Sequence, residues 1–482
     1  MSCSDEPAAD AAATLAAMRA GNCTGRSWRL PTLDLALLPA HEVRPLAGAL
    51  CPAIILSAAT RSGVEEISLW SSWSRLSDLL LLGHQDKTIE YDASVDSRFT
   101  YWDNATALAP EVRTIGVASQ GYVKVRGSPA SFLKRALSAS DAAGRVRYGS
   151  SLAAFSSTAG ARLGLQLPKQ QQQQQQHDSG GRLAALSPAG EREATAVGLW
   201  ISAAGVTSTY HFDRGDNLHI VLTGEKTVRL APPSLESFAS LGIRPCTHPH
   251  GRQARRAPTE VSVEAAADAA AEEVPSAAVH AISTVLTAGS AVFMPAGWLH
   301  ELQTGSAGPA AALSLTSRPF EDVDFAAFIS DVDQHAPFIR EAFGGEYSRR
   351  TAREALLVYV PALLRELRVD ARALHAAFAA SYSADTQLEA GIVFDDAPSL
   401  RRDPRCEPTA GRAERAIIER TAASVAARLR GYRAALLPHY LMLYLDLLLI
   451  KVGGTGDVPV VLSRMMAWVH ACGDEWLFPA TK

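Results

Sequence analysis

A histidine and an aspartate stand two residues apart in the stretch STYHFDRGDNLHIVLTGEKTVRLAPP, residues 208–233. In a β-strand, residues two apart project from the same face, so His211 and Asp213 point together while Phe212 faces the other side. An ionised carboxylate that points into an apolar sheet interior is costly unless a cation or hydrogen-bond donors compensate it. The pair therefore predicts a bound metal ion.

A third ligand has to come from elsewhere in the chain, and His300 in FMPAGWLHEL is the leading candidate. It follows a turn that contains Pro295 and Gly297 and lies in a strand-like run. Two histidines and one carboxylate on one face of a metal leave three positions open, which is typical of non-haem Fe(II) oxygenases. Such a ferrous site keeps a positive charge and favours an anionic, chelating cosubstrate. The alternative is a neutral core histidine that is hydrogen-bonded to a buried acid.

Lys226 lies thirteen residues after Asp213, in the TGEK turn. A strand that starts at this turn returns antiparallel and can place the lysine ammonium in the same cavity as the metal. A buried lysine needs a counter-anion, and a dicarboxylate supplies one. The alternative is an exposed lysine of a hairpin. His219, in the same run, is expected in the core or behind the metal ligands, and not as a ligand itself.

The elements around this stretch read as strands with short helices between them. One helix is expected over residues 128–139, with Ser128 as its N-cap and Pro129 in its first turn. After the turn at Pro295 the sequence is strand-like again. The earlier strands are predicted from short apolar runs, at 51–59, 87–94 and 121–127.

The chain is expected to have three parts. Two insertions interrupt the β-rich part, one with seven consecutive glutamines and one rich in Ala and Glu. Neither has an apolar face to bury, so both are interpreted as surface loops. In the last part, apolar residues recur at a spacing of three and four, which predicts helices, and Pro361 should kink or divide one of them. The expected parts are a disordered tail over 1–28, a β-rich domain over 29–320 with insertions at 166–182 and 251–280, and a helical region over 321–482.

Composition limits the class of protein. The chain has 482 residues, 47% of them hydrophobic, and a formal net charge of −4, so no basic field indicates a nucleic-acid partner. Its six cysteines contain no C-x-x-C pair, which favours a reducing compartment over a disulfide framework. The N-terminus lacks the pattern of a secretory signal, and the apolar run 434–450 is too short for a membrane span. These features predict a cytoplasmic or nuclear protein with no membrane contact.

Two segments carry a resemblance to a known family. Residues 198–233 and 286–303 contain GLWISAAGVTSTYHFDRGDNLHIVLTGEKTVRLAPP and LTAGSAVFMPAGWLHEL, and in motif, order and turn placement they resemble the JmjC (cupin-like) family of Fe(II)- and 2-oxoglutarate-dependent oxygenases, in its hydroxylase-like branch. The resemblance covers roughly residues 50–320. It implies a double-stranded β-helix, the jelly-roll of cupins, as a barrel domain flanked by helical N-terminal elements and an α-helical C-terminal region.

The resemblance also implies roles for particular residues. It makes His211, Asp213 and His300 the Fe(II) ligands, and it pairs Lys226 with the far carboxylate of 2-oxoglutarate. Ser314 departs from the family, because many relatives have asparagine there. The further cosubstrate contacts that it implies come from Ser208 or Thr209, Asn217 and Tyr148.

The expected activity is hydroxylation of a protein side chain, with a protein as substrate. Demethylation of a methyl-lysine and hydroxylation of a tRNA base are the alternatives within the family. A non-catalytic cupin scaffold and a zinc or manganese cupin isomerase are alternatives from other classes. The C-terminal helices can pack on the barrel or bury a homodimer interface, and the sequence leaves both open.

Overall fold

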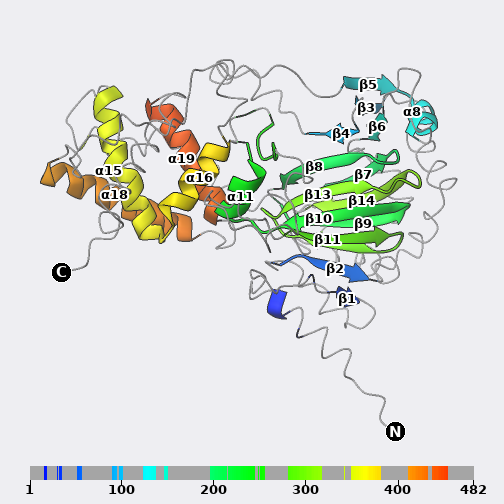
Figure 1. Ribbon diagram of the computed structural model, residues 1–482, viewed down its shortest axis with the longest axis horizontal. Coiled ribbons are helices and arrows are strands. Elements are labelled where there is room, and N and C mark those ends of the chain that lie inside the picture. The colour runs from blue at the N-terminus through cyan, green and yellow to red at the C-terminus, as the bar shows by residue number, and fades with distance from the viewer. Residues whose placement is uncertain are drawn as a thin grey trace, which may run out of the picture. The chain divides into compact units, whose positions relative to one another are not determined.

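The structure is a computed structural model, and it divides the chain into two compact units. The first contains residues 1–100, 120–232 and 280–320, and the second contains residues 101–119, 233–279 and 321–482. Each is drawn in Figure 1. The residues that the structure describes are 13, 16–18, 30, 32–34, 51–56, 89–94, 97–100, 123–136, 146–149, 196–213, 215–244, 248, 250–255, 281–316, 341, 349–381, 411–431 and 437–453.

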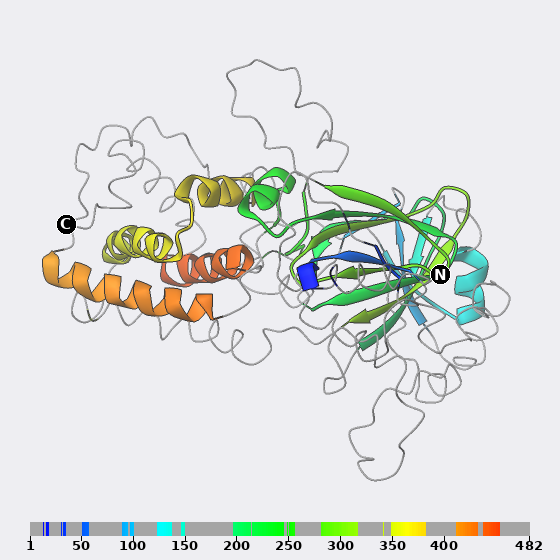
Figure 2. The same ribbon diagram turned by 90° about the horizontal axis from the view of Figure 1, so that it is seen from below.

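Two facing sheets make up the first unit (Figures 1 and 2). In order across the larger sheet, the strands are β1 (Thr32–Asp34), β2 (Ala53–Leu56), β12 (Ala291–Met294), β9 (Asn217–Thr223), β14 (Ala310–Thr316), β7 (Ala196–Ser202), β6 (Val146–Gly149), β3 (Ile89–Ser94) and β5 (Val123–Gly127). In the smaller sheet they are β11 (Ile282–Thr287), β10 (Glu225–Ala231), β13 (Leu299–Thr304), β8 (Thr207–Phe212) and β4 (Arg98–Phe99).

Strands β7 to β14 alternate between the two sheets, and only β10 and β11 follow each other within one sheet. This is the jelly-roll arrangement, so the predicted fold class is confirmed. The word barrel needs correction. Among the described strands, no hydrogen-bonded pair joins one sheet to the other, and the domain is therefore a sandwich whose sheets meet through side chains.

The core between the sheets explains why these segments are strands. Every residue of β9 is buried, as expected of a central strand that lies between β12 and β14. In β10 the burial alternates, because Lys226, Val228 and Leu230 are buried while Thr227 and Arg229 are only half-buried. Lys226 therefore belongs to the inner face of the smaller sheet, together with the two aliphatic residues.

The predicted N-terminal helix of this unit is present as α8 (Pro129–Ala136). Its N-cap is the expected one, because the Ser131 amide donates a 3.2 Å hydrogen bond to Ser128 Oγ. Cys51 is buried and disulfide-bonded, whereas the cysteine spacing predicted no disulfide framework. The glutamine run, residues 256–280 of the second insertion and most of the expected N-terminal tail lie outside the described residues.

Helices form the second unit. They are α11 (Leu235–Leu241), α15 (Arg349–Leu367), α16 (Ala371–Ser381), α18 (Arg412–Arg430) and α19 (Leu437–Gly453). Helix α15 packs on α18 and α19, and α11 packs on α16. Pro361 does not divide α15, which is continuous across it. The apolar run near the C-terminus is the largely buried helix α19, where Tyr444 contacts Tyr359 through a 2.6 Å hydrogen bond. Among the described helices, none combines the length and apolarity that crossing a membrane requires.

Candidate metal centre

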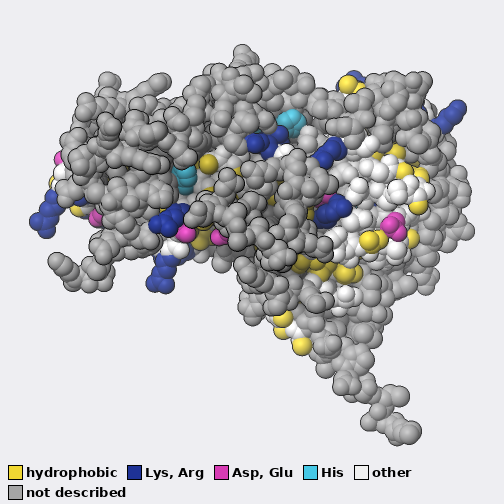
Figure 3. Space-filling model, viewed as in Figure 1, with side chains coloured by type: hydrophobic (Ala, Val, Ile, Leu, Met, Phe, Trp, Pro, Cys, Tyr) yellow, Lys and Arg dark blue, Asp and Glu magenta, His cyan; other side chains and the backbone are white. Residues whose placement is uncertain are grey.

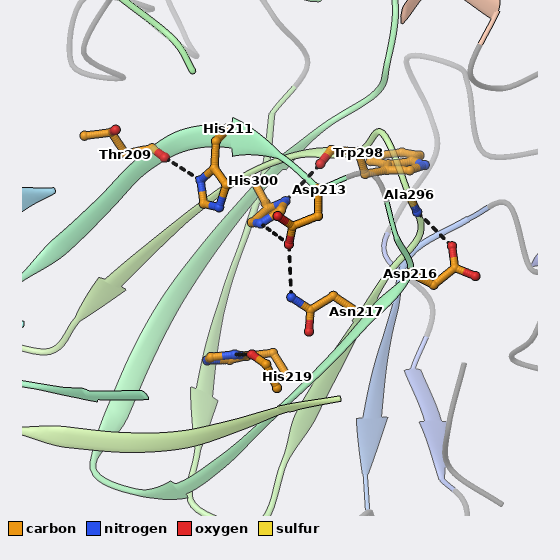
Figure 4. Close-up of polar contacts among 10 residues, drawn as sticks. Thr209, His211, Asp213, Asp216, Asn217, His219, Ala296, Trp298 and His300 are labelled. Carbon is orange, nitrogen blue, oxygen red and sulfur yellow. Dashed lines mark hydrogen bonds and ion pairs between the residues drawn. The ribbon is translucent and has the colours of Figure 1, made fainter. Parts of the chain in front are cut away.

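His211 and His300 lie directly opposite each other on the paired strands β8 and β13. Side chains of directly opposite residues share a face, and the two ring centroids are 4.2 Å apart. Leu230, on the inner face of β10, is the partner of His300 on the other side. Both rings therefore face the space between the two sheets, as Figure 4 shows.

Backbone carbonyl groups fix the orientation of both rings. His211 Nδ1 lies 2.7 Å from the Thr209 carbonyl oxygen, and His300 Nδ1 lies 2.9 Å from the Trp298 carbonyl oxygen. A carbonyl oxygen only accepts, so each Nδ1 carries the hydrogen and Nε2 is the nitrogen that each ring can offer to a metal. This arrangement is the usual support of a metal-binding histidine.

Asp213 completes the group, although it lies one residue beyond the end of β8. Its Oδ2 is 3.6 Å from His300 Nε2, and it accepts a 3.2 Å hydrogen bond from Asn217 Nδ2. One ligand atom from each of His211, Asp213 and His300 lies within 4.8 Å of the others. Ligands about 2.1 Å from a metal and at right angles are about 3 Å apart, so this donor set fits one metal ion.

Two hydrogen bonds join the loop of Asp213 to the turn that precedes His300. The Gly297 amide donates to the Asp213 carbonyl oxygen at 2.8 Å, and the Ala296 amide donates to Asp216 Oδ1 at 2.8 Å. Asp216 is fully buried. Gly297 has a φ of 82°, which a type II turn requires at this position. Asp216 thus has a structural role, because it holds the turn before His300 in place.

Lys226 is 3% exposed, on the same inner face as Leu230. Burial lowers the pKa of its ammonium to about 8. Burial is the cause of this shift, and no carboxylate among the described residues offsets it. Its cross-strand neighbour Thr304 hydrogen-bonds to Ser202 of the larger sheet at 2.6 Å. A buried cation without a counter-ion is costly, so the site is suited to an anionic ligand.

The other residues expected around the cosubstrate come from several strands, and their contacts differ from one residue to the next. Ser208 is half-buried and pairs with Leu302 of the inner face. Thr209 lies at a register shift in β8, and its hydroxyl donates to the Phe99 carbonyl oxygen at 3.3 Å. Asn217 contacts the Asp213 carboxylate. Tyr148 pairs with Ser202 through the backbone of β6 and β7, and its side chain is not among those described.

His219, expected from the sequence in the core or behind the metal ligands, is buried. It is 1% exposed, and its Nδ1 lies 2.8 Å from Ser314 Oγ. Burial holds its pKa well below the ordinary value, and the charges of Lys226 and His300 lower it further. His219 is therefore a neutral imidazole near both the buried lysine and the candidate metal ligands. No spacing rule indicates this, because β9 is buried on both faces.

The comparisons with known proteins agree with this arrangement. The family model for the cupin-like domain matches residues 124–316, a range that contains the three candidate ligands and Lys226. The chain therefore contains a cupin-like domain, the domain characteristic of JmjC proteins. No curated protein matches the chain.

Proposed function

We propose that this protein is an Fe(II)- and 2-oxoglutarate-dependent oxygenase that hydroxylates a protein side chain. The observation that carries the proposal is the convergence of His211, Asp213 and His300 on the inner face that also holds Lys226. Two imidazoles and one carboxylate are the ligands of non-haem Fe(II) oxygenases, and they leave sites for a chelating cosubstrate and dioxygen.

The residues present fit both groups. His211 and His300 offer Nε2, and Asn217 orients the Asp213 carboxylate, so a divalent metal has three ligands held by neighbouring groups. In the described part of the chain, His219 Nε2 and Asn217 Oδ1 are buried without hydrogen-bond partners, and Lys226 is buried on the facing strand β10. An anionic ligand between the sheets can accept hydrogen bonds from Lys226 and from His219 Nε2, whereas Asn217 Oδ1 needs a donor such as water.

Each residue has a defined task in this proposal. Bound iron with 2-oxoglutarate supplies the oxidising chemistry, in which decarboxylation to succinate accompanies insertion of one oxygen atom into a C–H bond. His211, Asp213 and His300 hold the metal, and the Lys226 ammonium binds the far carboxylate of 2-oxoglutarate. Lys226 is buried between the two sheets, which strengthens its charge pairing with the carboxylate.

A protein substrate is favoured over a nucleic acid by charge. The net charge of the chain is −4. On the face drawn in Figure 3, the described Lys and Arg side chains stand singly or in small groups and form no continuous stripe. A phosphate backbone is usually bound by such a basic stripe.

The test measures succinate release from 2-oxoglutarate by anaerobically reconstituted protein after dioxygen is admitted, with Fe(II), Mn(II) or Zn(II). We expect Fe(II)-dependent release, and we expect His211→Ala to abolish it. His375→Ala, at a half-buried position of α16 in the other unit, is the matched control and should keep it. Mass spectrometry of candidate proteins then seeks a gain of about 16 Da with wild type only. The function is excluded if the protein binds 2-oxoglutarate with none of these metals, or if it is active only with Zn(II) or Mn(II).

A further inference from the structure

His219 faces the metal side of the sandwich. It lies two residues from Asn217 in β9, so both side chains project from the same face of the strand. Asn217 reaches the Asp213 carboxylate from that face. The influence of the Lys226 and His300 charges on His219 agrees with this placement. Figure 4 shows the His219 ring on the strand that carries Asn217.

One nitrogen of this ring has a partner and the other has none. Ser314, directly opposite on β14, places its Oγ 2.8 Å from Nδ1. Nε2 is buried, and among the described residues it has no hydrogen-bond partner. A buried polar atom without a partner is uncommon in folded proteins and indicates a ligand or water. Lys226 is buried on the facing strand β10, and its charge acts on His219, so one acceptor between the sheets can bind both nitrogen groups.

On the basis of the proposed function, we infer that His219 Nε2–H is a second donor to the carboxylate of 2-oxoglutarate that Lys226 binds, and that Ser314 supports this tautomer by donating to Nδ1. The Ser314 hydroxyl donates to Nδ1, which leaves the hydrogen on Nε2. In the opposite tautomer Nε2 would present a lone pair to the carboxylate and repel it. A neutral imidazole adds a donor without burying a second positive charge beside Lys226.

The inference also gives a reason for the serine at position 314, where many relatives of the JmjC family have asparagine. A serine hydroxyl is short, and it rotates to donate to a ring nitrogen on the adjacent strand. The pair His219 and Ser314 then acts as one unit, in which the serine is a positioning residue and the histidine contacts the ligand.

The test is calorimetric binding of two 2-oxo acids to the full-length protein loaded with Mn(II). 2-Oxoglutarate has the far carboxylate, and 2-oxobutyrate chelates a metal in the same way but lacks it. We expect His219→Leu to raise the Kd of 2-oxoglutarate roughly tenfold to a hundredfold and that of 2-oxobutyrate less than about threefold. His219→Gln, whose amide nitrogen can replace Nε2–H, should stay within about threefold of wild type for both acids. Mn(II) affinity should be unchanged.

Ser314→Ala tests the same inference if His219→Leu does not fold. It should weaken 2-oxoglutarate binding severalfold and leave 2-oxobutyrate binding unchanged. Equal losses for both acids in either variant would show that the pair only packs, and this overturns the inference. Wild-type binding of 2-oxoglutarate with no change in any variant overturns the inference alone. Wild-type protein that binds neither acid overturns the proposed function with it.

Discussion

The Gly297 amide donates a 2.8 Å hydrogen bond to the Asp213 carbonyl oxygen, and it thereby ties the turn before His300 to the loop that holds the carboxylate ligand. Asp216 adds a second tie through the Ala296 amide. The two segments are far apart in the chain, and these bonds set the distance between a histidine and a carboxylate that must share one ion. Metal affinity should therefore depend on residues that do not touch the metal.

Asp216→Ala tests this dependence. The change leaves the buried Ala296 amide without its acceptor, which costs about 1–3 kcal/mol of unfolding free energy. Because the turn before His300 is loosened, Mn(II) affinity should also fall roughly tenfold or more. Asp370→Ala is the matched control, since Asp370 Oδ1 accepts the Arg372 amide at 2.8 Å at the start of a helix in the other unit. That variant should lose stability without losing metal affinity, and a loss of affinity in both would contradict the prediction.

Lys226→Met should separate stability from binding. Lys226 is buried, and burial lowers the pKa of its ammonium, so a methionine of similar length removes a desolvated charge. We expect the unfolding free energy without ligand to stay equal or rise, while the Kd of 2-oxoglutarate rises about a hundredfold. Urea unfolding and calorimetry measure the two effects. Lys134→Met, at an exposed position of α8, should change neither. A large loss of stability in Lys226→Met would argue that the ammonium is already paired in the folded protein.

The pKa of Lys226 predicts how binding depends on pH. Burial lowers this pKa to about 8, below the ordinary 10.5. A bound carboxylate favours the ammonium, so 2-oxoglutarate affinity should be highest below pH 8 and should fall as the pH rises above it. Without ligand the sign is opposite, because the unfolded chain holds this proton up to pH 10.5. The unfolding free energy of the ligand-free protein should therefore rise between pH 8 and 10.5, as the buried lysine loses its charge. Calorimetric titrations from pH 7 to 9.5 check the first effect, and Lys226→Met should abolish it.

The sequence predicts much of this site because several features are local. Strand alternation places His211 and Asp213 on one side, and the TGEK turn returns Lys226 to the same cavity. The structure brings His211 and Asp213 together, although Asp213 lies just beyond its strand, and it places Lys226 on the inner face of β10. The pairing of His300 with His211 is a long-range register between distant segments. The turn before His300 and the family resemblance made His300 the expected third ligand, but no local pattern predicts which residue it lies opposite.

The roles of His219 and Thr209 could not be predicted for identifiable reasons. Alternation identifies the inner face only where one face is polar, and β9 is buried throughout, so His219 reads as core. Thr209 lies at the register shift between β8 and β13, which breaks the alternation and directs its hydroxyl to the Phe99 carbonyl. Helix α11 packs on α16 of the C-terminal region, and such a long-range contact leaves no periodic trace in the sequence.

The turn between β9 and β10 carries the chain from one sheet to the other, and its Gly224 has a φ of 78°. A Cβ at this position would collide with the Pro309 carbonyl oxygen and lie 2.8 Å from Ala310 Cα. Gly224→Ala should therefore cost more than the roughly 1–2 kcal/mol of left-handed strain, and it should displace Lys226 two residues later. Gly205→Ala isolates the strain, because Gly205 has a φ of 74° and nothing lies within 4 Å of its added Cβ. In urea unfolding, Gly224→Ala should lose clearly more stability than Gly205→Ala, and only Gly224→Ala should weaken 2-oxoglutarate binding. Equal losses in the two variants would show that the approach of Pro309 does not constrain this turn.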